Sequence, residues 1–145
     1  MVASFWLYAV HLMQKNVIFG FLLFLFAVLP AGAKNTDIVN ELAEHLKNAN
    51  FREISRHFSS TVEMIILSEE DIYSKAQAEI ILKDFLSKHK PESAKVIHRL
   101  ESNPSYRFAV IELKTENGHF RTTMSLNDTA GQFLITELRI EFQKE

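Results

Sequence analysis

The apolar pattern of this 145-residue chain changes at Pro91, and that change constrains its fold more than any other feature. Before Pro91 the apolar residues mostly recur every third or fourth position, which is typical of amphipathic helices. After it they alternate with polar residues, which is typical of strands that face a core on one side. Helices that precede a run of strands indicate an α+β domain rather than alternating β-α units.

Two helices are predicted at the start of this domain. The first covers about Asp37–Lys47 and carries one apolar stripe: Ile38, Val39, Leu42, Ala43 and Leu46. The second begins after Asn50, which forms a capping-box pattern with Glu53. Its apolar residues share one face: Phe51, Ile54 and Phe58.

A strand and a longer helix follow. Thr61–Leu67 is β-branched and aliphatic, as strands are. Ile72–Tyr73 allow at most a brief further pairing. Ser74 and Gln77 then form a capping box for the third helix, which ends near His89.

Four consecutive strands are predicted after Pro91: Lys95–Glu101, Tyr106–Thr115, His119–Asn127 and Gln132–Phe142. Turn signals rich in Asn, Gly and Pro separate them. Short connections of this kind make an antiparallel meander. We therefore predict the order α-α-β-α-β-β-β-β, with three N-terminal helices packed on a curved antiparallel sheet. The simplest packing wraps this sheet around the third helix as a cone.

An export signal is predicted from the 13-residue run Val17–Leu29, in which every residue except Gly20 is apolar. This run is shorter than the about 20 apolar residues of a spanning helix. Ala31 and Ala33 follow it with the small-residue spacing of a signal cleavage site. Cleavage after Ala33 makes residues 1–33 the signal peptide and residues 34–145 one mature domain that begins at Lys34.

The true initiator is predicted to be Met13 rather than Met1. Residues 1–12 carry no Lys or Arg, whereas Met13 places Lys15 directly ahead of the apolar run, in the order that export requires. The predicted location is the periplasm or the medium, with no stable membrane anchor after cleavage. An uncleaved N-terminal anchor is the alternative.

The composition narrows the classes of partner. The chain has no cysteine, so it has neither a lipid-accepting cysteine nor disulfides. Its formal net charge is −2, and positive and negative residues are interspersed, so the sequence shows no basic patch that would indicate nucleic-acid binding. The five histidines after residue 33 lack the spacing of metal ligands, so neither a metal nor another cofactor is predicted.

The Tyr73–Glu79 segment, YSKAQAE, resembles the DUF4783 family of small exported bacterial proteins of unknown function. Phe85, His98, the Gly118–Arg121 turn and Leu138–Glu141 share in the resemblance, which covers about Ile38–Glu141. The resemblance implies the NTF2-like, or cystatin-like, cone fold. Because NTF2-like proteins include isomerases, dehydratases, ligand carriers and interaction modules, it implies no single activity.

Candidate site residues come from the chemistry that an NTF2-like lyase or isomerase needs, a base and a donor to an oxyanion. His98 is the candidate base, and Tyr73 and Glu63 are further catalytic candidates. Arg121, His98 and Tyr73 are the ligand-binding candidates, with Arg121 as an anchor for a carboxylate. Each also has a structural interpretation: an edge contact for His98, helix initiation for Tyr73 and a cross-strand ion pair for Arg121.

We therefore expect a small exported domain that binds a small apolar ligand or an envelope protein without catalysis. The alternative is a cofactor-free lyase or isomerase of the NTF2-like type that uses His98 and Tyr73. A homodimer is also expected, because Phe133 and Ile135 lie opposite the predicted core face of the last strand.

Overall fold

The structure, a computed structural model, describes residues 37–143. The predicted signal peptide, the initiator Met13 and the cleavage site after Ala33 lie outside these residues. Within them, no helix is both long enough and apolar enough to span a membrane.

Two amphipathic helices begin the described region, as predicted. α2 (Ile38–Lys47) buries the expected stripe: Val39, Leu42, Ala43 and Leu46. α3 (Phe51–Arg56) follows after a short link. The predicted capping box of α3 is not formed, because the Asn50 side chain makes no capping hydrogen bond and Glu53 pairs instead with Arg56 at 2.8 Å.

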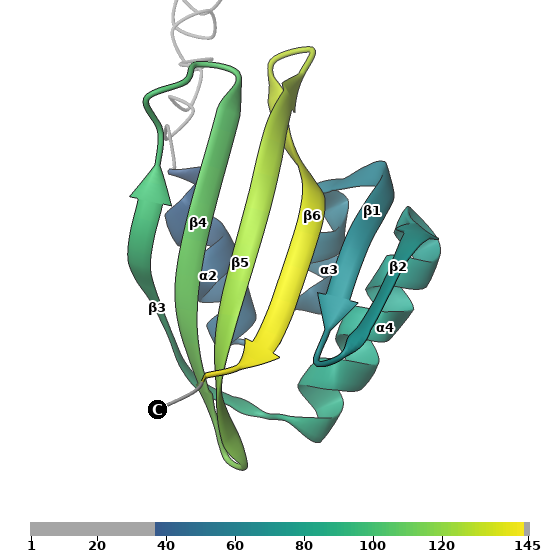
Figure 1. The fold of residues 1–145 in the computed structure, drawn as a ribbon, viewed down its shortest axis with the longest axis vertical. Helices are drawn as coiled ribbons and strands as arrows, with labels where there is room; N and C mark the ends of the chain where they lie inside the picture. The colour runs from purple at the N-terminus through teal and green to yellow at the C-terminus, as the bar shows by residue number, and fades with distance from the viewer. Residues whose placement is uncertain (1–36, 144–145) are drawn as a thin grey trace, which may run out of the picture. The chain divides into compact units, whose positions relative to one another are not determined.

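Six strands and one long helix follow (Figure 1). The strands are β1 (Phe58–Ile66), β2 (Glu69–Ser74), β3 (Pro91–Leu100), β4 (Tyr106–Thr115), β5 (Gly118–Thr129) and β6 (Gln132–Phe142). The long helix, α4 (Lys75–Lys88), connects β2 to β3. Phe58, predicted on the second helix, therefore belongs to β1. β3 begins at Pro91 rather than at Lys95.

The sheet order β2-β1-β6-β5-β4-β3 corrects the predicted topology in two respects. β2 is a full strand that pairs with β1 along its whole length, so the order is α-α-β-β-α-β-β-β-β. β1 pairs with β6 in parallel, so the sheet is mixed rather than antiparallel. These partners are far apart in sequence, and local periodicity carries no information on their relative direction.

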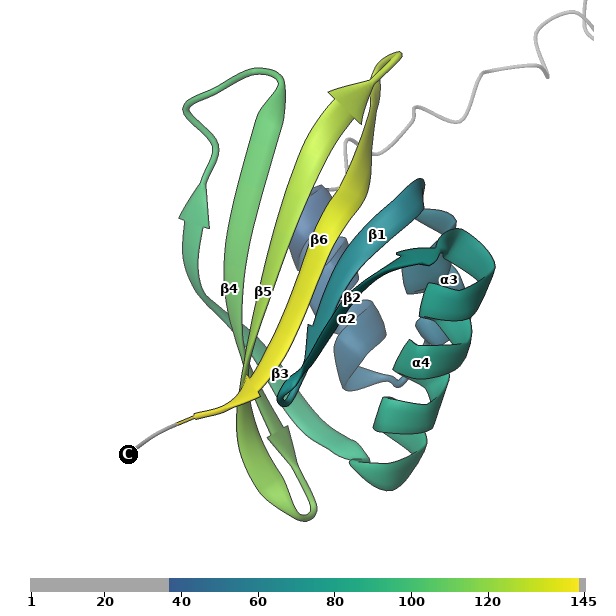
Figure 2. The ribbon, with the colours of Figure 1, turned by 45° about the vertical axis from the view of Figure 1, so that its right-hand side comes forward.

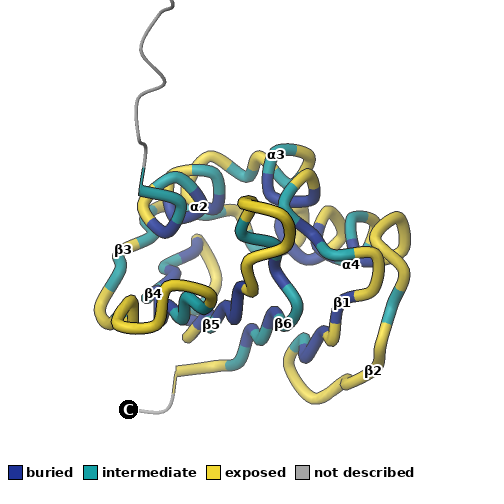
Figure 3. The backbone as a smooth tube through the Cα atoms, turned by 90° about the horizontal axis from the view of Figure 1, so that it is seen from above, coloured by how far each residue is buried: buried dark blue, intermediate teal, exposed yellow. Residues whose placement is uncertain are grey.

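The helices of the described region all cover one face of the curved sheet (Figure 2). α4 leaves the β2 edge and leads to β3 at the opposite edge, and the meander then returns to β6. Side chains fill the space between the sheet and the helices, and the largest fully buried ones include Phe58, Phe120, Met64, Met124 and Leu82. β2 lies at the exposed margin of this arrangement (Figure 3).

A bulge in β6 changes which residues of this strand face the core. Thr136 is an extra residue opposite β5, so the alternation of faces shifts by one position. Ile135 and Leu138 consequently both lie in the core, each 0% exposed. This corrects the prediction that Ile135 and Phe133 form an exposed face, and Phe133 is half-buried with the Arg107 guanidinium 4.4 Å from its ring centre. The homodimer stays a prediction, without these two side chains as support.

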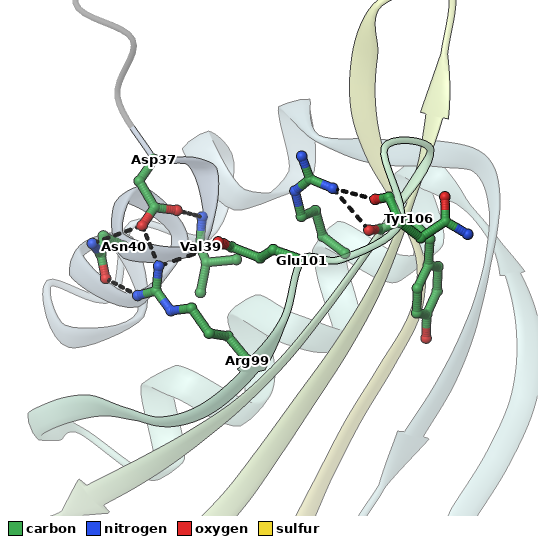
Figure 4. Close-up of polar contacts among 8 residues, drawn as sticks. Asp37, Val39, Asn40, Arg99, Glu101 and Tyr106 are labelled. Atoms are coloured by element: carbon green, nitrogen blue, oxygen red, sulfur yellow. Dashed lines mark hydrogen bonds and ion pairs between the residues drawn. The ribbon is translucent and has the colours of Figure 1, made fainter.

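Arg99 ties the first turn of α2 to the end of β3 (Figure 4). The Asp37 carboxylate caps α2 by accepting a hydrogen bond from the Val39 amide at 3.0 Å. The Arg99 guanidinium donates to Asp37 and, at 2.7 Å, to the Asn40 side-chain oxygen. Partial burial raises the pKa of Asp37, but the hydrogen bonds from Arg99 and Val39 outweigh it and hold the pKa below its usual 3.8.

Asp37→Asn should reduce the loss of stability in acid. Because the folded-state pKa of Asp37 is depressed, its charged form stabilises the fold above the unfolded-state pKa, and this contribution is lost as the pH falls through the folded-state value. Urea unfolding should therefore show the free-energy difference between wild type and Asp37→Asn shrinking below about pH 4. Asparagine still caps a helix, so Asp37→Ala should be less stable than Asp37→Asn by about 1 kcal/mol at neutral pH. A difference that does not change with pH would show that the Arg99 pair contributes nothing.

The predicted capping box starts α4. The Ser74 hydroxyl accepts from the Gln77 amide at 3.4 Å, and the Gln77 side-chain oxygen accepts from the Ser74 amide at 3.2 Å. Tyr73, directly before the cap, packs against the core, and Ala78 is fully buried. The first part of the YSKAQAE motif is therefore explained by helix initiation.

Two charged residues of the same motif dock α4 on α3. The Lys75 ammonium donates to the carbonyl of Arg56, the last residue of α3, at 2.9 Å. The Glu79 carboxylate accepts from the hydroxyl of Ser55, a buried residue of α3, at 2.7 Å. Helix packing thus accounts for the rest of the motif without a ligand.

Ser74→Ala should destabilise the domain by about 1 kcal/mol, because it removes the acceptor that caps α4. Chemical or thermal unfolding measures the change. The control is Ser87→Ala, which alters an exposed serine in the last turn of the same helix. Equal stabilities of the two variants would contradict the role of the capping box.

Candidate functional site

A hollow of about 460 Å³ lies between α4 and the turn that joins β1 to β2. We call it the α4 groove, and it is lined by Ile66, Leu67, Ser68, Glu69, Ile80, Ile81, Asp84, Phe85, Lys88 and His89. Ile80 is 66% exposed and Leu67 is 37% exposed, whereas Phe85 is buried. The groove therefore presents aliphatic side chains to solvent above an apolar base.

A second hollow, of about 740 Å³, adjoins the first. We call it the Arg121 hollow, and its lining is Leu67, Ser68, Arg121, Glu141, Phe142 and Gln143. Arg121 is exposed, and its direct neighbours across the strands are Glu112 and Glu141. A ligand carboxylate at Arg121 would therefore meet two like charges as well as one guanidinium.

Leu67 adopts a left-handed backbone conformation in the turn that both hollows share. Leu67 and Ser68 form a two-residue loop between the paired residues Ile66 and Glu69, and the φ of Leu67 is 59°. Glycine is the usual residue for a positive φ in such loops, and a leucine costs about 1–2 kcal/mol there. The Leu67 amide donates to the Ile140 carbonyl at 2.7 Å, which holds the turn against β6. The turn thus keeps an aliphatic side chain beside the groove at a conformational cost.

Aromatic rings pack beside the groove at the end of α4. The ring centres of Phe85 and Phe120 are 5.2 Å apart, and His89 lies 4.7 Å from Phe85 and 4.9 Å from Phe120. The ring centre of Phe142 lies 4.8 Å from that of Phe120. Gly118 leaves room for this packing, because a β carbon there would lie 3.2 Å from the Phe120 ring.

Asn117 determines the tautomer of His89. The Asn117 side-chain amide donates to the Lys88 carbonyl at 3.0 Å, so its oxygen faces His89 Nδ1 at 2.8 Å. A neutral His89 therefore carries its proton on Nδ1 and keeps Nε2 as an acceptor.

The predicted base and proton donor lie at opposite edges of the sheet. His98 is exposed on β3, and Tyr73 is half-buried on β2, with four strands between these two edge strands. Glu63 is exposed on β1, where the residues on either side of it, Val62 and Met64, are buried in the core. Because side chains alternate along a strand, Glu63 faces away from the helices. The structure brings none of these three candidates together.

The other histidines of the described region do not join a cluster of metal ligands. Among residues 37–143, no three His, Asp or Glu side chains are placed to hold a metal ion. Burial lowers the pKa of His57 from its usual 6.5 and outweighs the opposite effect of Glu41. The His57 carbonyl accepts from the Ile135 amide at 2.7 Å, which gives this residue a place in the packing between α3 and β6.

The sequence patterns did not single out the groove residues. Ile80 could have been noticed, because it is an isoleucine on the polar side of α4, away from the stripe that is buried: Ala78, Leu82, Phe85 and Leu86. His89 lies one turn after Phe85 on the stripe that faces the sheet. Leu67 carries no signal of its positive φ, since nothing in its neighbourhood resembles a glycine turn.

The comparison with known proteins agrees with this fold. The model of DUF4783, a domain of unknown function, matches residues 39–141. A DUF4783 family protein from Bacteroides uniformis is 25% identical with a TM-score of 0.71, over 75% of this chain and 100% of that one. A DUF4783 family protein from Bacteroides ovatus is 24% identical with a TM-score of 0.68, over 81% of this chain and 97% of that one.

A more distant structure places the fold among a wider group. A protein provisionally named a ketosteroid isomerase, from Kribbella flavida, is 13% identical with a TM-score of 0.51, over 73% of this chain and 75% of that one. At this identity the likeness concerns the fold alone. No curated protein matches the sequence significantly. The chain therefore belongs to the DUF4783 family, a domain of unknown function, and its fold is similar to NTF2-like folds, including designed NTF2-type proteins.

Proposed function

We propose that this domain is a non-catalytic binding domain of the cell envelope and that the α4 groove receives an apolar group of its ligand. The observation that carries the proposal is Ile80, which is 66% exposed on a helix whose other large apolar residues are buried or half-buried. Covering apolar surface stabilises a complex by roughly 25 cal/mol per Å². Exposed aliphatic side chains beside a hollow are therefore a typical binding surface.

A surface groove is better supported than a ligand enclosed in the cone. The side chains between the sheet and the helices already pack against one another, and Phe58, Phe120 and Met64 are at most 1% exposed. An enclosed ligand would need part of this volume. Native cores resist such changes because they are close-packed.

The alternative function is a cofactor-free lyase or isomerase that uses His98 and Tyr73. Such a reaction needs the base and the proton donor within reach of one small substrate. Opposite edges of a six-stranded sheet do not offer that geometry. His98, Tyr73 and Arg121 each stay candidate contacts of a ligand, but at separate places on the surface.

Export is the part of the proposal that rests on the sequence alone. The exported chain should begin at Lys34, and a gene that starts at Met13 should export it as well as the full gene does. Intact-mass measurement of the exported protein tests both expectations. A mass that includes residues before Lys34 would favour the uncleaved anchor.

Leu67→Gly and Ile80→Ser should each weaken the binding of Nile red, a neutral apolar dye, by about fivefold or more. Each change removes apolar surface from the groove wall, and the loss of about 1 kcal/mol corresponds to a factor of about five. Leu67→Gly should still fold, because relief of about 1–2 kcal/mol of left-handed strain offsets most of the lost burial. Fluorescence titration of the dye measures the affinities, and urea unfolding checks the fold.

Matched controls separate the groove from general effects. Ala130→Gly relieves a positive φ of 55° in the β5–β6 turn, as Leu67→Gly does in the β1–β2 turn. Ile97→Ser removes an isoleucine that is 46% exposed on β3. Both controls should bind the dye as wild type does. If all four variants bind it equally, the groove is not the binding site.

A further inference from the structure

We propose that the occupant of the α4 groove is an amphipathic helical segment of another protein, with Lys or Arg beside its aliphatic face. The inference rests on the proposed function, because it names the class of partner for the same groove. Three features carry it: the charge on the groove rim, the closed edge of β2 and the open shape of the groove.

One carboxylate of β2 lines the groove, and a second lies on the same face of the strand. Glu69 lines the groove, and Asp71 lies on the same face of the strand because side chains alternate. The strand partners of these two residues on β1 are Ile66 and Met64, which belong to the core or pack against it. The carboxylates therefore point to the side of the sheet on which α4 lies.

The negative charge of this rim is not balanced within the described residues. Among residues 37–143, no Lys, Arg or His nitrogen lies within 4.0 Å of the carboxylates of Glu69 or Asp71. On the facing helix, Asp84 is neutralised by Lys88 at 2.7 Å. The groove also reaches the C-terminal end of α4, where the helix dipole adds negative potential. An apolar partner with cationic flanks is thus favoured over an anionic one.

The free edge of β2 is already closed to an added strand. The Ile72 amide donates to the Asp71 carboxylate at 2.7 Å, and the Ser74 amide donates to the Gln77 side chain at 3.2 Å. Ile72 and Ser74 are two positions apart, so both amides point to the same side of the strand, away from β1. A strand added at this edge would break both hydrogen bonds. The partner therefore contributes side chains rather than backbone, as in helix-in-groove recognition.

The groove is too open to enclose a small molecule. Small-molecule pockets bury most of the surface of their ligands, whereas Ile80 at this wall is 66% exposed. A helix can instead place aliphatic residues at i and i+4 on Ile80 and Leu67. Lys or Arg on the flank of the same helix then reaches Glu69 and Asp71.

The experiment compares three fluorescein-labelled peptides of about 16 residues, or about four helical turns. All three carry the same leucine stripe, and their flanking positions are Lys, Gln or Glu. Fluorescence anisotropy with the wild-type mature domain should show the Lys peptide binding about fivefold more tightly than the Gln peptide, and the Glu peptide weakest. The preference should diminish at high salt, where the charges are screened.

Two variants locate the binding and its charge preference. Ile80→Ser should weaken the binding of all three peptides. The double variant Glu69→Gln and Asp71→Asn should bind the Lys and Gln peptides equally. Its control neutralises two carboxylates elsewhere, in Glu44→Gln and Glu112→Gln, and should keep the preference for Lys.

The outcomes separate this inference from the proposed function. If the peptides bind without a preference for Lys, or if only Nile red binds and Ile80→Ser abolishes it, the groove is a binding site but the basic helix is the wrong partner. If the control double variant loses the preference for Lys as fully as the rim variant does, the attraction depends on net charge alone and the inference is wrong. If neither the dye nor any peptide responds to Ile80→Ser, both the inference and the proposed function are wrong.

Discussion

The parallel pairing of β1 with β6 joins the two halves of this domain. The described helices and the β1–β2 hairpin come from residues before Pro91, and the meander comes from residues after it. Leu67 extends the junction beyond the paired strands, because its amide donates to the Ile140 carbonyl. The turn beside the groove is therefore fixed to the meander. The opposite wall belongs to α4, which must cross from the edge at β2 to the edge at β3. The helix that connects the two edges of the sheet thus also forms one wall of the groove.

Two residues beside the groove depart from the pattern of the elements to which they belong. Along α4, Ala78, Leu82 and Phe85 face the core, but Ile80 faces solvent. Leu67 occupies a backbone conformation in which glycine would be less strained. The conformation of Leu67 costs stability, and both residues place aliphatic side chains beside one hollow. Under the proposed function, this coincidence reflects binding, because natural sequences break local rules mainly at functional sites.

Local sequence patterns correctly predicted the features that depend on neighbouring residues. They failed for features that depend on residues far apart in the sequence. The Ser74 cap, the α2 stripe and the four-strand meander depend on nearby residues and were predicted correctly. The direction of β1 against β6 depends on a distant partner. Ile135 was misplaced because the bulge at Thr136 carries no glycine or other mark in the sequence. The candidate site has the same limit: His98 and Tyr73 were chosen for their chemistry, but only the strand order shows that they lie at opposite edges.

The acidic residues of β2 combine two physical effects at one edge. Asp71 accepts the hydrogen bond of the Ile72 amide, which removes a donor that any added strand would need. Charged and blocked edges of this kind resist pairing with other chains, a hazard for every exposed strand. On the groove side, Glu69 lines the same hollow as Ile80. Under the proposed function, an edge closed to backbone pairing, beside a groove accessible to side chains, would limit unspecific association and still permit selection by charge. The same short strand would then serve both effects.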